Sequence, residues 1–201
     1  MNDTTDPSYA ARLAVSVEPR VGWRRLLDPQ RPYRWNIRRL DLGRVLDVGC
    51  GVGRNLAHLD GNGVGVDHNP TSVEIARQRG LLAYTTAEVD RDPQLLDGSF
   101  DSLLFAHVLE HLTTDEAADL VSSYLPRLRP DGQVVVICPQ ARGQRSDRTH
   151  VTFLPAPEIE RLLHRVGVRP ARSLSFPFPR IAGRWFTHNE TVVIGTWPDG
   201  R

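Results

Sequence analysis

The sequence contains no lysine, and all 25 positions counted as Lys or Arg are arginines. This absence excludes a lysine that acts as a general base, a nucleophile or a Schiff-base former. We attribute it to codon bias in a GC-rich genome. Only two cysteines are present, and Cys50 and Cys138 each end an apolar run. They argue against a disulfide framework or a zinc cluster and favour a reducing cytoplasm.

Long apolar runs and a charge excess are also missing. No segment approaches the ~20 apolar residues of a membrane-spanning helix, and the N-terminal MNDTTDPSYAARL lacks the charged-then-apolar pattern of a secretion signal. The formal net charge is +1, so no global attraction to nucleic acid or anionic lipid is expected. We therefore expect a cytoplasmic monomer or homodimer without a membrane span or a nucleic-acid partner.

The 201 residues suit a single domain with two parts. Residues 1–42 contain the apolar-periodic YAARLAVSV and the aromatic, arginine-rich WRRLLDPQRPYRWNIRRL. This N-terminal segment either packs on the core as an amphipathic helix or forms a lid over a substrate. In the second case Trp23, Tyr33 and Trp35 would form its walls. Residues 43–201 form the core, whose C-terminal loops lie on the substrate side.

The core alternates predicted strands and helices. Apolar strands are predicted for RVLDVG (44–49), GVGVD (63–67), LLAYTT (81–86), FDSLLFA (100–106), QVVVICP (133–139) and TVVIGTW (191–197). Helices are predicted for RNLAHL (54–59), PTSVEIARQRG (70–80), DEAADLVSSYLPRL (115–128) and PAPEIERLLHRVGV (155–168). Such alternation predicts a parallel sheet with helices on both faces, and ligands that bind at the carboxyl ends of the strands.

A glycine-rich turn follows the first strand. VLDVGCGVGRN carries Gly49, Gly51 and Gly53, which allow a tight turn and a close approach of the backbone to a ligand. A dinucleotide site would have its third glycine at position 54, where this chain has Arg54. Asp67 ends the second strand, where a carboxylate can accept hydrogen bonds from two ribose hydroxyls.

In this order, the segments VLDVGCGVGRN, GVDHNPTSVEIAR, DGSFDSLLFAHVLEHL and LRPDGQVVVICP resemble the motifs of class I S-adenosylmethionine-dependent methyltransferases. The resemblance covers about residues 44–165 and is greatest to the small-molecule O-methyltransferase branch of the ubiquinone pathway and of sugars. It implies an α/β, doubly wound, Rossmann-like sheet of seven mostly parallel strands whose last strand is antiparallel. It also implies that S-adenosylmethionine is the cofactor.

The resemblance also implies which residues contact the cofactor. Its methionine part would lie against the glycine turn and the end of the fourth strand, its ribose on the second strand and its adenine beyond. Glu88 stands where the family often has an acidic residue at the adenine edge, with Asp90 as the alternative. The implied cofactor-binding residues are Asp47, Gly49, Gly51, Asp67, His68, Glu88 and Ala106, with His107 beside the transferred methyl group.

HVLEHL, residues 107–112, also matches the H-x-x-E-H motif of one class of zinc peptidases. That chemistry needs a long helix and a further acidic ligand, whereas here the motif directly follows a buried strand, so we reject it. The resemblance to methyltransferases implies that this segment lies where the substrate meets the methyl group. His150, in the loop after the fifth strand, belongs to the same rim. These side chains are structural, supply a general base, or bind a metal; the catalytic candidates are His107, Glu110, His111 and His150.

The predicted reaction is methyl transfer to a hydroxyl of a small molecule, such as a saccharide or secondary metabolite. A hydroxyl must lose its proton, and a positioned base contributes ~10²- to 10⁴-fold to the rate. Glu110, His111 and His150 are the predicted ligands of a divalent metal (Mg, Mn or Zn) that holds this hydroxyl, and a histidine base without metal is the alternative. The alternatives in function are an RNA 2′-O-methyltransferase and a non-catalytic S-adenosylmethionine-binding protein.

Overall fold

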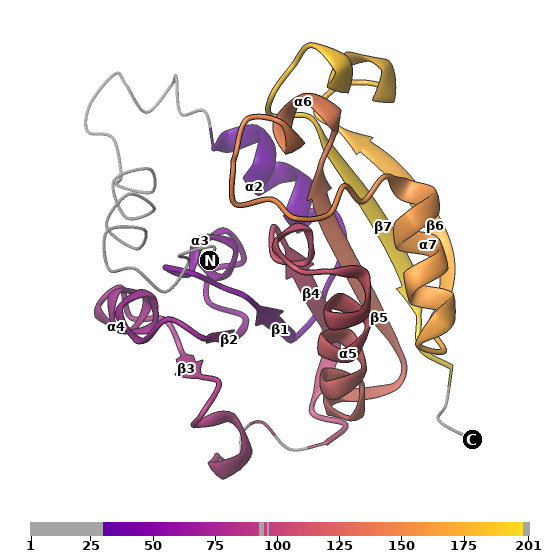
Figure 1. The fold of residues 1–201 in the computed structure, drawn as a ribbon. Helices are drawn as coiled ribbons and strands as arrows, with labels where there is room; N and C mark the ends of the chain where they lie inside the picture. Colours follow the sequence, from indigo (N-terminus) through magenta and orange to yellow (C-terminus); the bar gives the residue numbers. More distant parts are fainter. Residues whose placement is uncertain (1–29, 93–94, 96, 199–201) are drawn as a thin grey trace.

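The computed structural model describes residues 30–92, 95 and 97–198, and its centre is one seven-stranded sheet (Figure 1). The strands are β1 (Val45–Val48), β2 (Gly63–Asp67), β3 (Ala83–Thr85), β4 (Phe100–Ala106), β5 (Leu128–Pro139), β6 (Arg169–Phe176) and β7 (Glu190–Thr196). Their order across the sheet is β3-β2-β1-β4-β5-β7-β6. The chain reverses its direction of winding at β1, where the order turns from β3 and β2 to β4 and β5.

The last strand alone runs against the others. Pairings among β3, β2, β1, β4 and β5 are parallel, whereas β7 is antiparallel to both β5 and β6. The predicted doubly wound α/β sheet with an antiparallel last strand is therefore confirmed. Because β7 is reversed, its first residue lies at the same edge as the carboxyl end of β5, with Glu190 opposite Pro139.

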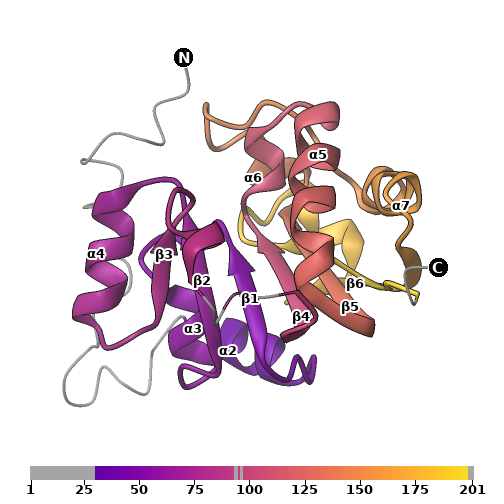
Figure 2. The ribbon, with the colours of Figure 1, turned by 90° about the horizontal axis from the view of Figure 1, so that it is seen from below.

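Helices cover both faces of the sheet (Figures 1 and 2). Strand residues such as Leu103 and Phe105 pack with α5 (Thr114–Tyr124) and α7 (Ala156–Arg165). The alternate residues of β4, Leu104 and Ala106, face α2 (Arg31–Arg38) and α3 (Arg54–His58). This alternation is the period-two pattern of a strand that is buried on both faces. The other α-helices of the described residues are α4 (Pro70–Gln78) and α6 (Ala141–Gln144).

Capping residues fix where the helices near the ligand edge begin. The Asn69 side chain accepts from the amides of Thr71 and Ser72, and Pro70 occupies the first position of α4. A capping box formed by Thr113 and Glu116 starts α5. Short 3₁₀ turns complete the fold: η2 (Val89–Arg91), η4 (Leu109–His111), η5 (Leu125–Arg127) and η6 (Arg180–Arg184).

The strand β6 was not identified from its sequence pattern. RPARSLSF lies at the edge of the sheet and is mostly exposed or half-buried, so it lacks the apolar character of the other strands. In the N-terminal segment, α2 carries Tyr33 and Trp35, while Trp23 lies outside the described residues. No helix within the described part of the chain is long and apolar enough to cross a membrane.

Candidate active site

The glycine turn after β1 brings the backbone against the segment that follows β4. Gly49 has a φ of +78°, which favours glycine, and a Cβ built on it would lie 2.7 Å from the Val108 side chain. The amides of Gly49 and Cys50 both donate to the carbonyl of Val66. The turn is thereby attached to β2 while it closes on the end of β4, which leaves room only for a residue without a side chain.

Asp47 is fully buried at this edge, and its charge is incompletely paired. Its Oδ1 accepts from Asn55 Nδ2 at 3.5 Å, and no hydrogen bond within the described residues reaches its Oδ2. Burial raises the pKa of Asp47 to about 7, against the opposing effects of Asn55 and Arg54. Because buried charges are normally paired, this oxygen is a position for a cationic ligand group. The methionine amino group would fit it.

Asp67 holds the turn and the start of α4 in place. Its Oδ2 accepts from the amide of Gly51 at 2.7 Å, and its Oδ1 accepts from the amide of Asn69 at 2.8 Å. Each carboxylate oxygen can accept more than one hydrogen bond, so acceptor capacity for a ribose remains. The neighbouring His68 side chain is 48% exposed, with Nδ1 at 3.5 Å from Asp67 Oδ1. Its proposed place against adenine stays a prediction.

Glu88, the residue expected at the adenine edge, is engaged locally. Its Oε2 accepts from the amide and hydroxyl of Thr85 and from Arg77 Nη2, at 2.7, 2.9 and 2.9 Å. The amide and hydroxyl of Thr85 lower the pKa of Glu88 and outweigh the small effect of burial, with help from Arg77. Among the described residues these hydrogen bonds all go to Oε2, and the adenine role of Glu88 stays a prediction. The side chain of Asp90, the alternative, lies outside the described residues.

His107 lies between two carboxylates. Its Nε2 is 2.8 Å from Glu190 Oε1, and its Nδ1 is 3.3 Å from Glu110 Oε1. Burial by itself lowers the pKa of His107, but the two carboxylates outweigh it and raise the pKa to about 9. The ring is therefore an imidazolium near neutral pH and donates to both. The backbone of His107 has a φ of +59°, which non-glycine residues seldom adopt. The histidine thus has a fixed orientation.

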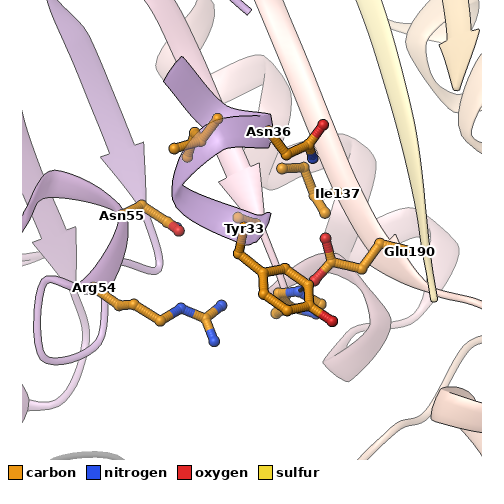
Figure 3. A pocket seen from close by; sticks show the side chains of 9 residues that line it. Tyr33, Asn36, Arg54, Asn55, Ile137 and Glu190 are labelled. Atoms are coloured by element: carbon orange, nitrogen blue, oxygen red, sulfur yellow. Dashed lines mark hydrogen bonds and ion pairs between the residues drawn. The ribbon is translucent and has the colours of Figure 1, made fainter. Parts of the chain in front are cut away.

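A pocket opens beside His107 (Figure 3). It contains about 290 Å³ of unfilled space, part of it open to solvent. In this view Arg54 extends from the left towards Tyr33 in the centre, and Glu190 extends from the right, from β7. Ala106, which was expected beside the methionine end, also lines it. The lining residues are Tyr33, Asn36, Ile37, Arg54, Asn55, Ala106, His107, Ile137 and Glu190.

Sequence reasoning missed Glu190, and it left Arg54 without a role in the site. Glu190 precedes the apolar run TVVIGT, so its pattern is that of an ordinary strand boundary. An antiparallel last strand places its first residue at the ligand edge, and this was the available signal. Tyr33, predicted as a lid wall, is fixed here because its hydroxyl donates to the carbonyl of His188 at 2.8 Å.

Glu110, His111 and His150 form a cluster directly behind His107. One ligand atom from each lies within 4.8 Å of the others. Glu110 is fully buried, and its Oε1 is 4.0 Å from His150 Nε2. Its Oε2 has no hydrogen bond within the described residues, although the buried thiol of Cys138 is a neighbour whose pKa Glu110 helps to raise. Burial also raises the pKa of Glu110, but the bond and charge of His107 outweigh it and lower the pKa.

The two histidines of this cluster turn the same nitrogen towards it. His150 Nδ1 is 3.1 Å from the carbonyl of Gln144, to which it donates, and its Nε2 faces Glu110. His111 Nδ1 is 3.2 Å from the carbonyl of Thr149, to which it donates. Burial mainly lowers the pKa of His111, which favours its neutral form. Such second bonds orient histidines that bind metals, and the three residues lie in one turn and one loop, not on the long helix of a zinc peptidase.

Comparison with known proteins shows which family the central part of the chain resembles. A family model described as a methyltransferase domain matches residues 46–136, which include the glycine turn, Asp67 and the HVLEHL segment. Over residues 46–136 the chain is therefore similar to a methyltransferase domain. Over 133 residues it is 28% identical to ajmaline N-methyltransferase of Rauvolfia serpentina, a match that covers 61% of this chain and 44% of that protein. The chain thus spans less than half the length of this curated relative.

Solved structures share the fold at low sequence identity. One is the complex of the Haloferax volcanii Trm112 methyltransferase activator with a methyltransferase, with a TM-score of 0.70 at 17% identity, over 96% of this chain and 97% of that chain. Another is magnesium protoporphyrin IX methyltransferase of Synechocystis PCC 6803 with bound SAH, with a TM-score of 0.64 at 17% identity, over 96% and 95% of the two chains. This likeness extends the methyltransferase fold across nearly the whole chain.

Proposed function

We propose that this methyltransferase transfers the methyl group of S-adenosylmethionine to a hydroxyl of a small molecule, such as a saccharide or a secondary metabolite. The observation that carries the proposal is the position of His107, fixed between Glu110 and Glu190 in the wall of the pocket. A bound sulfonium supplies an activated methyl group, so the protein must align the acceptor and accept its proton. A hydroxyl must lose its proton when it is methylated, so it needs this network of ionisable groups more than a nitrogen acceptor does.

The residues of the carboxyl edge fit the cofactor. The unpaired Oδ2 of Asp47 would hold the methionine amino group, and the glycine turn at Gly49 and Gly51 would lie against its backbone. Asp67 would hold the ribose, with His68 against the adenine and Glu88 at its edge. Ala106 and His107 would flank the sulfur. We propose these roles for this chain on the strength of the fold, the family match and the unpaired carboxylate.

We also propose that Glu110, His111 and His150 hold a divalent cation that positions the acceptor hydroxyl. Support comes from their mutual closeness and from the two histidine Nδ1 atoms, which face backbone carbonyls and leave both Nε2 atoms for the cation. Mixed nitrogen and oxygen ligands favour zinc or manganese over magnesium, which prefers oxygen alone. The alternative is that His111, the neutral histidine, acts as a base without metal.

Calorimetry separates these two possibilities without knowledge of the acceptor. Metal-free protein is titrated with Mn²⁺, Zn²⁺ and Mg²⁺ in turn, and Glu110→Gln and His150→Ala variants are compared with it. His164→Ala, which changes an exposed histidine on α7, is the matched control. Binding that both cluster variants abolish and the control retains supports the cation. Absence of binding to the wild-type protein rejects it and leaves the histidine base.

Label transfer tests the reaction itself. The protein is incubated with S-adenosylmethionine labelled in its methyl group and with catechol, methyl β-D-glucopyranoside, tryptamine or a small RNA. Transfer to the diol or the phenol supports the proposal, and transfer to tryptamine alone replaces it with N-methylation. Transfer to RNA revives the RNA 2′-O-methyltransferase. Binding of S-adenosylmethionine without transfer to any broad acceptor panel favours the non-catalytic alternative.

A further inference from the structure

Glu190 is a strand residue whose side chain lies in the pocket. It is the first residue of β7 and lies opposite Pro139 at the carboxyl edge of the sheet. Its side chain is only 10% exposed, yet it lines the pocket together with Ala106 and His107. A buried carboxylate in a pocket needs a counter-charge or a hydrogen-bond donor. His107 supplies a hydrogen-bond donor to one of the two carboxylate oxygens, Oε1.

The orientation of the Glu190 carboxylate is fixed by its contact with His107. Oε1 accepts from His107 Nε2 at 2.8 Å, while the other nitrogen of the ring donates to Glu110. No described residue makes a hydrogen bond to Glu190 Oε2, so this oxygen is available to a ligand in the pocket. Figure 3 shows the carboxylate pointing towards Tyr33. The contact with His107 Nε2 thus holds the Glu190 carboxylate in one direction.

We propose that Glu190 is a catalytic residue that faces the methyl-accepting atom and takes its proton through Oε2, while His107 is its positioning residue. This inference rests on the proposed cofactor binding. The lone pair of the acceptor oxygen forms the bond to the methyl carbon, the bond from that carbon to sulfur breaks, and its electron pair returns to sulfur. The acceptor proton passes to Glu190 Oε2. Atoms and charges balance without any further reactant.

This assignment restricts the chemical class of the acceptor. A carboxylate at the reacting atom accepts a hydrogen bond, so the acceptor must carry both a hydrogen and a lone pair on that atom, as a hydroxyl or a primary or secondary amine does. A carboxylate acceptor would place two like charges side by side, which is unfavourable. We therefore expect no methyl-ester formation by this enzyme. The same pocket would attract any ligand that presents a cation where the methyl group lies.

Sinefungin tests this arrangement without an acceptor, because its amine replaces the transferred methyl group and S-adenosylhomocysteine has nothing there. Dissociation constants of both ligands are measured by calorimetry at neutral pH. A charge-assisted hydrogen bond to Glu190 should make the wild-type protein bind sinefungin about 10- to 100-fold more tightly than S-adenosylhomocysteine. Equal affinities overturn the role of Glu190. Failure of both ligands to bind overturns the proposed cofactor binding instead, so the two failures are distinguishable.

Variants then assign the preference to this residue. Glu190→Gln should remove most of the sinefungin preference and leave the affinity for S-adenosylhomocysteine within about threefold, and Glu190→Asp should keep part of it. Asp119→Asn, which removes an exposed carboxylate from α5, is the control and should change neither affinity. An unchanged preference in Glu190→Gln rejects the proposal, as does an equal loss for both ligands. If Glu190→Gln does not fold, Glu190→Asp decides the matter, because a full wild-type preference in this variant rejects the proposal.

Discussion

Replacement of Asp47 by asparagine should stabilise the free protein and weaken its binding of the cofactor. Burial raises the pKa of Asp47 from 3.8 to about 7 in the folded protein. Its contribution to stability is therefore fully present below pH 3.8 and is lost as the pH rises through about 7. With about 1.4 kcal/mol per pKa unit, the ionised carboxylate costs up to about 4 kcal/mol above neutral pH. Asp47→Asn should recover part of this free energy of unfolding at pH 8.

The same carboxylate should make cofactor affinity depend on pH. Only ionised Asp47 can pair with the methionine ammonium, so wild-type affinity for S-adenosylhomocysteine should fall about 25-fold between pH 7.5 and pH 5.5. Asp47→Asn should lose this dependence and, at pH 7.5, bind about 10- to 100-fold more weakly, the value of one charge-assisted hydrogen bond. Calorimetry gives the affinity, and urea unfolding gives the stability.

Two results would refute this reasoning about Asp47. One is an asparagine variant that binds S-adenosylhomocysteine as tightly as the wild-type protein at pH 7.5. The other is a wild-type affinity that does not change between pH 5.5 and pH 7.5. Either would mean that the unpaired oxygen of Asp47 is not the position of the amino group. If Asp47→Asn raised the stability without any effect on affinity, Asp47 would be a buried acid of the core with no role in cofactor binding.

The remaining predictions concern the histidine, the thiols and the lid. His107 should titrate near pH 9 in an NMR experiment. Its contribution to stability should be present below pH 6.5 and lost as the pH rises through about 9. A titration midpoint near 6.5 would contradict the contact of His107 with two carboxylates. Burial raises the pKa of both Cys50 and Cys138 well above the usual value, so neither should react with a thiol reagent until the protein unfolds. Hydrogen exchange in residues 9–42, which contain Trp23, Tyr33 and Trp35, should slow when cofactor and acceptor bind. Unchanged exchange would mean that this segment only packs on the core and does not act as a lid.

Most of the fold was predictable because its strands and helices are locally consistent. The apolar runs of β1, β2, β4, β5 and β7 are buried on both faces, and the helices between them have clear amphipathic patterns. The strand β6 was not predicted because an edge strand rich in arginine lacks an apolar pattern. Its pairing with β7 is a property of the whole sheet and leaves no local pattern in the sequence.

The candidate site was predictable only where its residues lie next to a motif. The side chains of the glycine turn, Asp67 and the HVLEHL segment are close in sequence to the strand ends that place them. The contact of His107 with Glu190 joins residues 83 positions apart, and no spacing rule predicts it. The same holds for the pocket contacts of Tyr33 and Arg54, which depend on how α2 and α3 pack against the sheet.

The most direct test of the account is a crystal structure of this protein with S-adenosylhomocysteine. We predict that the ligand lies at the carboxyl edge of the sheet, with its amino group on Asp47, its ribose hydroxyls on Asp67 and its sulfur facing Ala106, His107 and Glu190. A ligand bound elsewhere, or one whose sulfur points away from Glu190, would contradict the account.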